Sequence, residues 1–313
     1  MATPNNSSTK QEKRDCNKDR LGRWLFTSTT TNPIKDFRPD ARQIRWMQFL
    51  NIHGYASSKY LHEFTTNTHC CPQTSNRMLR QLFDGQMVYK PKQQRETEGA
   101  DAHHHVYALT EKGFAFLKRE GLWEDALKLT GPWVHQYMIA CITSSIHILC
   151  NQSGLTYIPG HTITADLSTK VPFTWGRKRF EYHLIPDSLF AIKYQKGYIA
   201  YLVEADRNTE PNDPATPHRK SARRSIKQYA EFIGKKQYKK RFTLNCPLIV
   251  LNISVSDDHV QRVLKIVDEE IGACSYLAFG TAKEFRTPFK VPNEIIDCMK
   301  MARNGAREFE VIK

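Results

Sequence analysis

The spacing of apolar residues in the first third of the chain predicts three helices followed by a β-hairpin. Apolar side chains recur at helical spacing, and Ser, Pro and Gly residues stand where the helices begin and end. The predicted helices span residues 40–52, 57–64 and 73–83. Two β-prone segments, 87–90 and 106–109, flank a charged stretch, and a further helix follows, capped by Thr110. Elements in this order are typical of a winged helix-turn-helix.

The rest of the chain predicts an α/β domain with a mixed sheet. Strands are predicted over residues 184–194, 198–207, 246–254 and 276–280, and helices over 133–150, 218–236 and 257–271. Strands that are apolar on both faces need helices on both sides of their sheet. The fold class is therefore α+β or α/β, with a winged helix-turn-helix ahead of the mixed-sheet domain. The expected parts are a disordered basic arm (1–37), a winged-helix domain (38–121), a linker (122–131) and the α/β domain (132–313).

The charge of the chain favours a polyanionic partner. Lys and Arg number 46 against 32 acidic residues, which gives a net charge of +14. Binding to phosphates releases condensed counterions, so a basic protein of this kind favours nucleic acid. No apolar run reaches the roughly 20 residues that cross a bilayer. We therefore expect a cytoplasmic, DNA-associated bacterial protein that binds double-stranded DNA and no membrane.

One face of the predicted helix at 73–83 carries side chains suited to reading base edges in the major groove. These are Gln73, Thr74, Ser75, Asn76, Arg77, Arg80 and Gln81. The hairpin adds three candidates for contacts with phosphates, Lys90, Lys92 and Arg95. A winged helix that contacts only protein is the alternative.

Three acidic residues, Asp187, Glu204 and Asp206, are predicted to meet near one edge of the sheet. A tight turn at Lys196-Gly197 would place Asp187 opposite Asp206, and residues two apart on a strand share a face. A one-residue slip would turn Asp187 to the other face. Clustered acids beside an apolar sheet favour a hard cation, Mg²⁺ or Mn²⁺, which could activate water near DNA. Acids exposed to solvent at strand ends are the alternative.

The predicted helix at 218–236 is strongly basic. Its lysines and arginines repeat at four-residue spacing, which favours a track for phosphates over a solvated face. The candidates for DNA contacts are Arg219, Arg223 and Arg224, and two lysines, Lys220 and Lys227, lie on the same helix. His135, early in the helix at 133–150, is interpreted as a core or capping histidine.

The order of these motifs resembles the PD-(D/E)xK nuclease core, and with the preceding winged helix it resembles the replication-relaxation family, which is related to plasmid relaxases. The matching stretches are WVHQY, LIPDSLFAI, YLVEADRNTE and KSARRSIKQYAEF. The resemblance implies a restriction-endonuclease-like second domain, with Asp187 and Glu204 as metal ligands. Asp206 stands where the nuclease motif has lysine. Either Lys220 or Lys227 replaces that lysine, or the site is altered or inactive.

Three functions follow as alternatives. The resemblance implies a protein of a mobile element that binds an origin and nicks one strand with a divalent metal. Tyr229 would then be either a covalent nucleophile or a packing residue. The second alternative is a non-catalytic initiator or transcriptional regulator, and the third is a restriction-like endonuclease. Replication or conjugation proteins and a second copy of the chain are the other expected partners.

Overall fold

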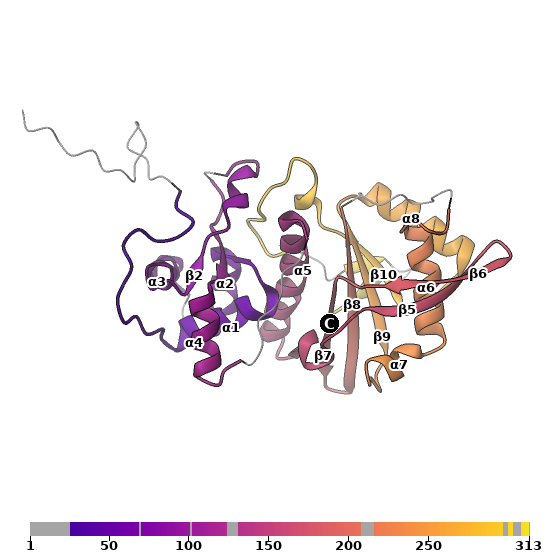
Figure 1. The fold of residues 1–313 in the computed structure, drawn as a ribbon, viewed down its shortest axis with the longest axis horizontal. Coiled ribbons are helices and arrows are strands. Elements are labelled where there is room, and N and C mark those ends of the chain that lie inside the picture. Colours follow the sequence, from indigo (N-terminus) through magenta and orange to yellow (C-terminus); the bar gives the residue numbers. More distant parts are fainter. Residues whose placement is uncertain are drawn as a thin grey trace, which may run out of the picture.

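The computed structural model describes residues 26–68, 70–100, 102–123, 131–207, 216–296, 300–302 and 308–312. These residues form an N-terminal helical unit and a larger unit built on a sheet, with one long helix, α5 (Trp133–Gln152), between them (Figure 1). Residues 1–25 of the expected basic arm lie outside the described residues.

The N-terminal unit has four helices and a small antiparallel sheet with the strand order β1-β3-β2. Its elements are α1 (Ala41–His53), β1 (Ala56–Ser57), α2 (Ser58–Phe64), α3 (Pro72–Asp84), β2 (Val88–Tyr89), the 3-10 helix η1 (Lys92–Glu96), β3 (Val106–Leu109) and α4 (Glu111–Arg119). Ser57 accepts a hydrogen bond from the backbone N–H of Tyr60, and Thr110 accepts one from that of Gly113. Both predicted helix starts are confirmed, because each cap satisfies an N–H that the first turn leaves without a partner.

The larger unit is a mixed sheet of seven strands, in the order β12-β11-β10-β9-β8-β7-β4. The bounds are β4 (Thr156–Pro159), β7 (Ser188–Tyr194), β8 (Gly197–Asp206), β9 (Leu248–Ser254), β10 (Leu277–Thr281), β11 (Lys300–Ala302) and β12 (Glu308–Glu310). The central strands β8, β9 and β10 are parallel, and the other pairs are antiparallel. The prediction that residues 276–280 form the last strand is wrong, because β11 and β12 continue the sheet beyond them.

Helices cover both faces of this sheet (Figure 1). Alternate residues of the strands point to opposite sides: Phe190 and Tyr201 belong to the core on the α5 side, whereas Leu189 and Leu202 pack on the other side. There the covering helices are α6 (Ala222–Gly234) and α8 (Asp257–Glu270), and a short helix, α7 (Gln237–Arg241), follows α6. The expected basic helix at 218–236 is shorter, since Ser221 caps α6.

Helix α5 joins the two units through one continuous apolar core. That core contains residues of α1 and α2, of α5 and of the strands that α5 covers. Tyr60 of α2 illustrates the connection: its hydroxyl accepts a hydrogen bond from Ser145 of α5 (3.2 Å) and another from the backbone N–H of Ile296 (3.1 Å). The N-terminal unit is thereby fixed to the sheet through α5.

Two segments differ from the sequence prediction. Residues 26–37, expected within the disordered arm, run along the N-terminal unit, where the backbone N–H of Ile34 donates to the carbonyl of Asp84 (2.8 Å). Phe37 packs so closely on Gly85 that a Cβ at this glycine would lie 2.2 Å from its ring. The stretch after α5, which shows no clear pattern in the sequence, contains a separate hairpin of β5 (Thr169–Trp175) and β6 (Lys178–Leu184).

Within the described ranges, the helices are all too short or too polar to cross a membrane.

His53 of α1, which is buried, and His147 of α5, which is partly buried, meet where the N-terminal unit contacts α5. Nε2 of His53 lies 3.0 Å from Nδ1 of His147, and Nδ1 of His53 lies 2.8 Å from the hydroxyl of Thr143. Burial lowers the pKa of both rings, that of His147 to about 3, because an imidazolium loses its hydration there. Both rings are therefore neutral in the folded protein near neutral pH.

We expect acid to destabilise the protein through this pair. The unfolded state binds protons near pH 6.5 whereas the folded state does not, so stability falls as the pH drops below about 6.5. Each ring contributes up to about 1.4 kcal/mol per pH unit until the pH approaches its folded pKa. Urea unfolding at pH 7 and pH 5 measures the effect. His147→Gln should flatten this pH dependence, and an unchanged slope would contradict the assignment.

Candidate functional site

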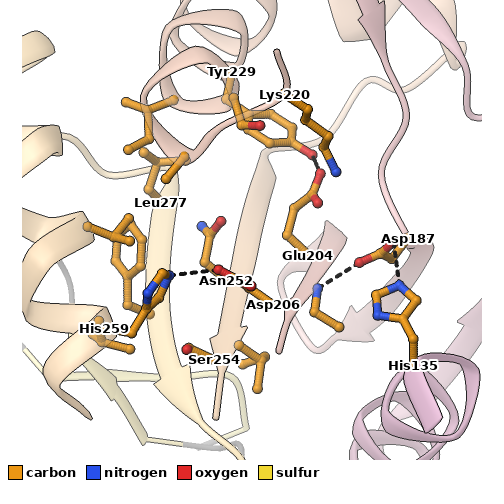
Figure 2. Close-up of a pocket in the computed structure, with 18 residues that line it drawn as sticks. His135, Asp187, Glu204, Asp206, Lys220, Tyr229, Asn252, Ser254, His259 and Leu277 are labelled. Carbon is orange, nitrogen blue, oxygen red and sulfur yellow. Dashed lines mark hydrogen bonds and ion pairs between the residues drawn. The ribbon is translucent and has the colours of Figure 1, made fainter. Parts of the chain in front are cut away.

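A pocket opens at the carboxyl ends of the parallel strands β8 and β9, beneath α6 and α8. Glu204 and Asp206 of β8 stand beside Asn252 and Ser254 of β9 in the strand register. The polar side chains that line the pocket come from three helices, two strands and two connections: His135, Asp187, Glu204, Asp206, Lys220, Ser225, Tyr229, Asn252, Ser254 and His259. The three acids of the sequence motif therefore border one pocket (Figure 2).

The strands β7 and β8 pair in a register two residues from the expected one. The last pair of the ladder is Ser188 with Val203, so Asp187 is nearest in register to Glu204 and not to Asp206. The expected pairing of Asp187 with Asp206 is wrong, because the chain turns one residue earlier than predicted. A shift of two residues leaves each side chain on the same face, so the acids still approach the same pocket.

Asp187 is bound from two sides. Its Oδ1 lies 3.1 Å from Nε2 of His135, in the first turn of α5, and its Oδ2 accepts a hydrogen bond of 2.7 Å from the backbone N–H of Ala205. Both interactions are drawn in Figure 2. The contact with Ala205 fixes the carboxylate against the end of β8, and the carboxylate in turn orients the imidazole at the pocket wall.

Glu204 and Asp206 have partners on the helices that cover this face. The hydroxyl of Tyr229 of α6 donates a hydrogen bond to Glu204. The ammonium group of Lys220 lies beside these two side chains (Figure 2). Nε2 of His259, in the first turn of α8, lies 2.7 Å from Oδ2 of Asp206. Tyr229 is buried, as the packing interpretation expects, and it also lines the pocket; its alternative role as a covalent nucleophile stays a prediction.

The three carboxylates do not form a common cation site. Each one turns to a different protein donor, and among the residues that the structure describes no three His, Cys, Asp or Glu side chains lie close enough together to hold a metal ion. The three acids therefore border one pocket, but each is held there by a partner of its own. The physical reason is that partly buried carboxylates need hydrogen-bond donors, and α5, α6 and α8 each supply one. The requirement for Mg²⁺ or Mn²⁺ stays a prediction.

The two lysines that could replace the motif lysine lie in different surroundings. Lys220 lines the pocket. Lys227 forms an ion pair with Glu270 of α8 and lies outside the pocket, so its proposed role at the acids is wrong. The four-residue spacing that suggested a phosphate track instead brings Lys227 and Arg223 to the same acidic partner on α8.

The arginines of the basic helix also have structural partners. Arg223 pairs with Glu269 (2.7 Å) and Glu270 of α8. Arg224 is buried and donates to the carbonyl of His218 (3.2 Å). The structure does not support the expectation that these two arginines contact DNA: Arg223 faces acidic residues of α8, and Arg224 is buried against Tyr182 of β6. Arg219 is exposed ahead of α6 and stays a candidate.

Most of the polar residues predicted on α3 are exposed: Gln73, Asn76, Arg77, Arg80 and Gln81. Thr74 is partly buried. Ser75 is buried and accepts a hydrogen bond from Arg42 (2.8 Å), so its assignment to the base-reading face is wrong. The helical repeat puts Ser75 on the same side as Leu79, which faces the core.

In the connection between β2 and β3, Lys92 and Arg95 are exposed on η1 as expected. Lys90 is not: it is buried, with its ammonium group 4.6 Å from the ring centre of Phe83. Burial lowers the pKa of Lys90 to about 8. The predicted phosphate contact of Lys90 is therefore wrong, since its charge is held against aromatic rings.

The sequence prediction missed His259, and it interpreted His135 as a core or capping histidine and not as a residue of the site. His259 has a signal that could have found it: a helix that follows a parallel strand begins at the carboxyl edge of the sheet, and His259 lies in the first turn after the cap Ser256. His135 has no such signal, because α5 precedes all strands of the sheet. Only the packing of α5 brings it to Asp187.

Comparison with models of protein families identifies the family of this chain. The model of a protein family described as replication-relaxation matches residues 47–249, which is more than half of the chain. No curated protein and no solved structure matches this chain. The matched range includes α3, the motif acids and α6.

Proposed function

Because the chain belongs to the replication-relaxation family, we propose that it binds double-stranded DNA at specific sites and acts in the replication or relaxation of a mobile element. The N-terminal unit supplies the recognition of DNA, and α3 is its base-reading helix. The exposed polar face of α3 is the observation that carries this proposal.

The order of elements in the N-terminal unit supports a winged helix-turn-helix. Two helices precede α3, and β2 and β3 form the hairpin that follows it. In that fold the last of the three helices enters the major groove. Gln73, Asn76 and Arg77 are exposed on α3 while Leu79 and Leu82 are fully buried, so the helix is anchored by one face and presents amide and guanidinium groups on the other.

The connection after β2 serves as the wing. Lys92 and Arg95 are exposed there, and phosphate contacts of this kind position a protein on the duplex without reading its sequence. Base contacts by α3 and phosphate contacts by η1 (Lys92–Glu96) would together define one binding site.

Arg77→Ala should weaken binding to the preferred duplex by about 1–3 kcal/mol, and it should change binding to random duplex little, if Arg77 contacts a base. Lys92→Ala should weaken both and lower the salt slope by about one unit, since it removes one phosphate contact. A duplex selected from a random library provides the preferred site, and fluorescence anisotropy measures the affinities. Arg119→Ala, which removes an exposed arginine from α4, is the matched control. Equal losses on both duplexes for Arg77→Ala would contradict base reading.

A second candidate function is cleavage of a DNA strand at the pocket. The observation that favours it is that the three motif acids, Lys220 and two histidines paired with aspartates line the same pocket. In this proposal His135, oriented by Asp187, takes a proton from a water whose oxygen bonds to phosphorus, while the P–O bond to one strand end breaks. Lys220 stabilises the charge that develops on the phosphate, and the leaving oxygen takes a proton from solvent. The assay is conversion of supercoiled plasmid with EDTA, Mg²⁺ or Mn²⁺.

The products of that assay separate the remaining alternatives. Open-circular plasmid indicates a nicking enzyme, and linear plasmid indicates a restriction-like endonuclease. Intact plasmid under every condition, with binding preserved, indicates a non-catalytic initiator or regulator.

A further inference from the structure

The hairpin of β5 (Thr169–Trp175) and β6 (Lys178–Leu184) is a two-stranded sheet of its own, separate from the seven-stranded sheet. It lies over α6, at the end of the molecule opposite α3 (Figure 1). Seven residue pairs join its strands, from Thr169 with Leu184 to Trp175 with Lys178. The proposed winged helix and the pocket leave this hairpin without a role.

The base of the hairpin is held rigidly by α6. Nε2 of Gln228 donates to the carbonyls of Val171 (3.2 Å) and Tyr182 (2.8 Å), so one side chain binds both strands. The guanidinium of Arg224 lies 4.4 Å from the ring centre of Tyr182. Buried hydrogen bonds to both strands fix the direction in which the tip projects.

The tip of the hairpin is basic and exposed. Gly176, with a φ of 58°, and Arg177 form the turn. Arg177 and Lys178 are both exposed, and neither forms an ion pair with another described residue. Arg179, the next residue, pairs with Glu231 at 3.3 Å but keeps 66% of its side chain exposed. Two adjacent cations without an acidic partner are suited to a polyanion.

We propose that this tip is a second DNA-binding element, in which Arg177 and Lys178 contact the phosphate backbone of a duplex that extends beyond the α3 site. The inference rests on the proposed binding of duplex DNA. A strand of seven residues spans about 23 Å, and β6 leads through Ile185 and Pro186 to Asp187. A duplex that crosses the pocket would therefore meet the tip roughly seven base pairs away.

Comparing a long with a short duplex tests whether the tip contributes to binding beyond the contribution of α3. The hairpin and α3 lie at opposite ends of the structure (Figure 1), so one short duplex cannot contact both. We expect the double variant Arg177→Ala/Lys178→Ala to bind a random 40-base-pair duplex about tenfold or more weakly at 0.1 M salt, with a salt slope smaller by about 1.8. Its binding to a 12-base-pair duplex through α3 should stay unchanged.

The matched control removes the same two residue types elsewhere. Arg262 and Lys265 are exposed on α8, and Arg262→Ala/Lys265→Ala lowers the net charge equally. We expect this control to bind both duplexes as the wild type does. The reversal Arg177→Glu/Lys178→Glu should produce a larger loss on the long duplex, with an unchanged melting temperature because the tip is exposed.

The outcomes separate this inference from the proposed function. Wild-type affinity and slope for Arg177→Ala/Lys178→Ala on the long duplex overturn the role of the tip and leave the winged-helix proposal standing. An equal loss in the control also overturns it, since net charge alone would then explain the effect. If a wild-type protein fails to bind either duplex, the binding of DNA itself is refuted.

Discussion

Asp187→Ala is expected to abolish strand cleavage while leaving DNA binding intact. Asp187 holds Nε2 of His135 at 3.1 Å, so its loss frees the imidazole from the position in which it could take a proton from water. General acid–base catalysis of this kind contributes about 10²–10⁴-fold to a rate. The proposed DNA-binding face on α3 belongs to a different unit and should be unaffected. Conversion of supercoiled plasmid measures cleavage, and anisotropy measures binding.

A matched control keeps this prediction specific. Asp268 is an exposed aspartate of α8 outside the pocket, and Asp268→Ala should cleave as the wild type does. His135→Ala should reproduce the loss seen for Asp187→Ala, because the two side chains act as a pair. If both variants cleave at the wild-type rate, the pocket is not where the strand is cut.

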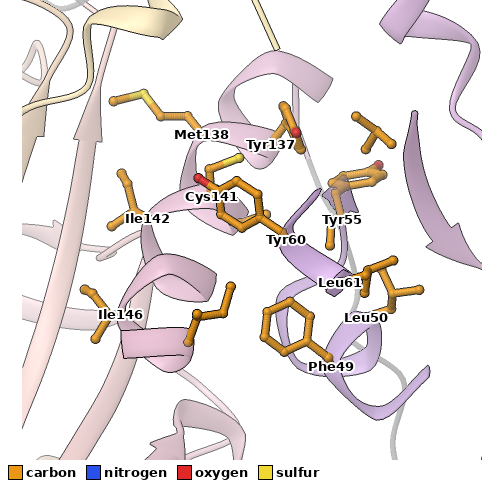
Figure 3. Packing of buried hydrophobic residues seen from close by; sticks show 14 of the residues in the cluster. Phe49, Leu50, Tyr55, Tyr60, Leu61, Tyr137, Met138, Cys141, Ile142 and Ile146 are labelled. Carbon is orange, nitrogen blue, oxygen red and sulfur yellow. The ribbon is translucent and has the colours of Figure 1, made fainter. Parts of the chain in front are cut away.

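Ile142→Ala is expected to lower the free energy of unfolding by about 2–5 kcal/mol, the range for truncating a fully buried aliphatic side chain. Ile142 is completely buried in the core. Figure 3 shows it pointing from α5 toward the sheet, whereas Tyr137 and Cys141 of the same helix face Tyr60 of α2. Because α5 packs on both units, we expect one cooperative transition that shifts as a whole. Urea unfolding followed by circular dichroism and by tryptophan fluorescence measures it.

The control for this substitution is Ile34→Ala, at an isoleucine that is 41% exposed. Its effect should stay within roughly 0.5 kcal/mol, as for most exposed positions. Two separate transitions, with only one of them shifted by Ile142→Ala, would show that the units unfold independently and that α5 does not couple them.

Local signals in the sequence predicted the helices well. Ser57, Thr110 and Ser256 cap the helices expected to begin there, since a capping side chain acts within three residues of its own position. The strands that carry the acids were also predicted, because their apolar runs identify them. Structure that depends on residues a few positions apart can therefore be predicted from the local sequence alone.

The charged side chains could not be assigned in this way. Arg223, Lys227 and Lys90 have the composition of a DNA-binding surface, but α8 neutralises the first two and aromatic rings surround the third. A lysine or arginine serves an internal ion pair or a phosphate equally well, and only the residues brought near it decide between them. Charge along the chain therefore predicts a polyanionic partner, but it does not identify the residues that would contact such a partner.

The sequence by itself determined that the chain has helices, then a hairpin, then a covered sheet, and that three acids stand near the ends of neighbouring strands. Tertiary structure alone decided what those acids contact, because the packing of α5 and α8 depends on residues far away in the chain. Asp187 meets His135 across 52 positions, and no local pattern encodes such a contact. The chemistry of the pocket follows from that long-range packing.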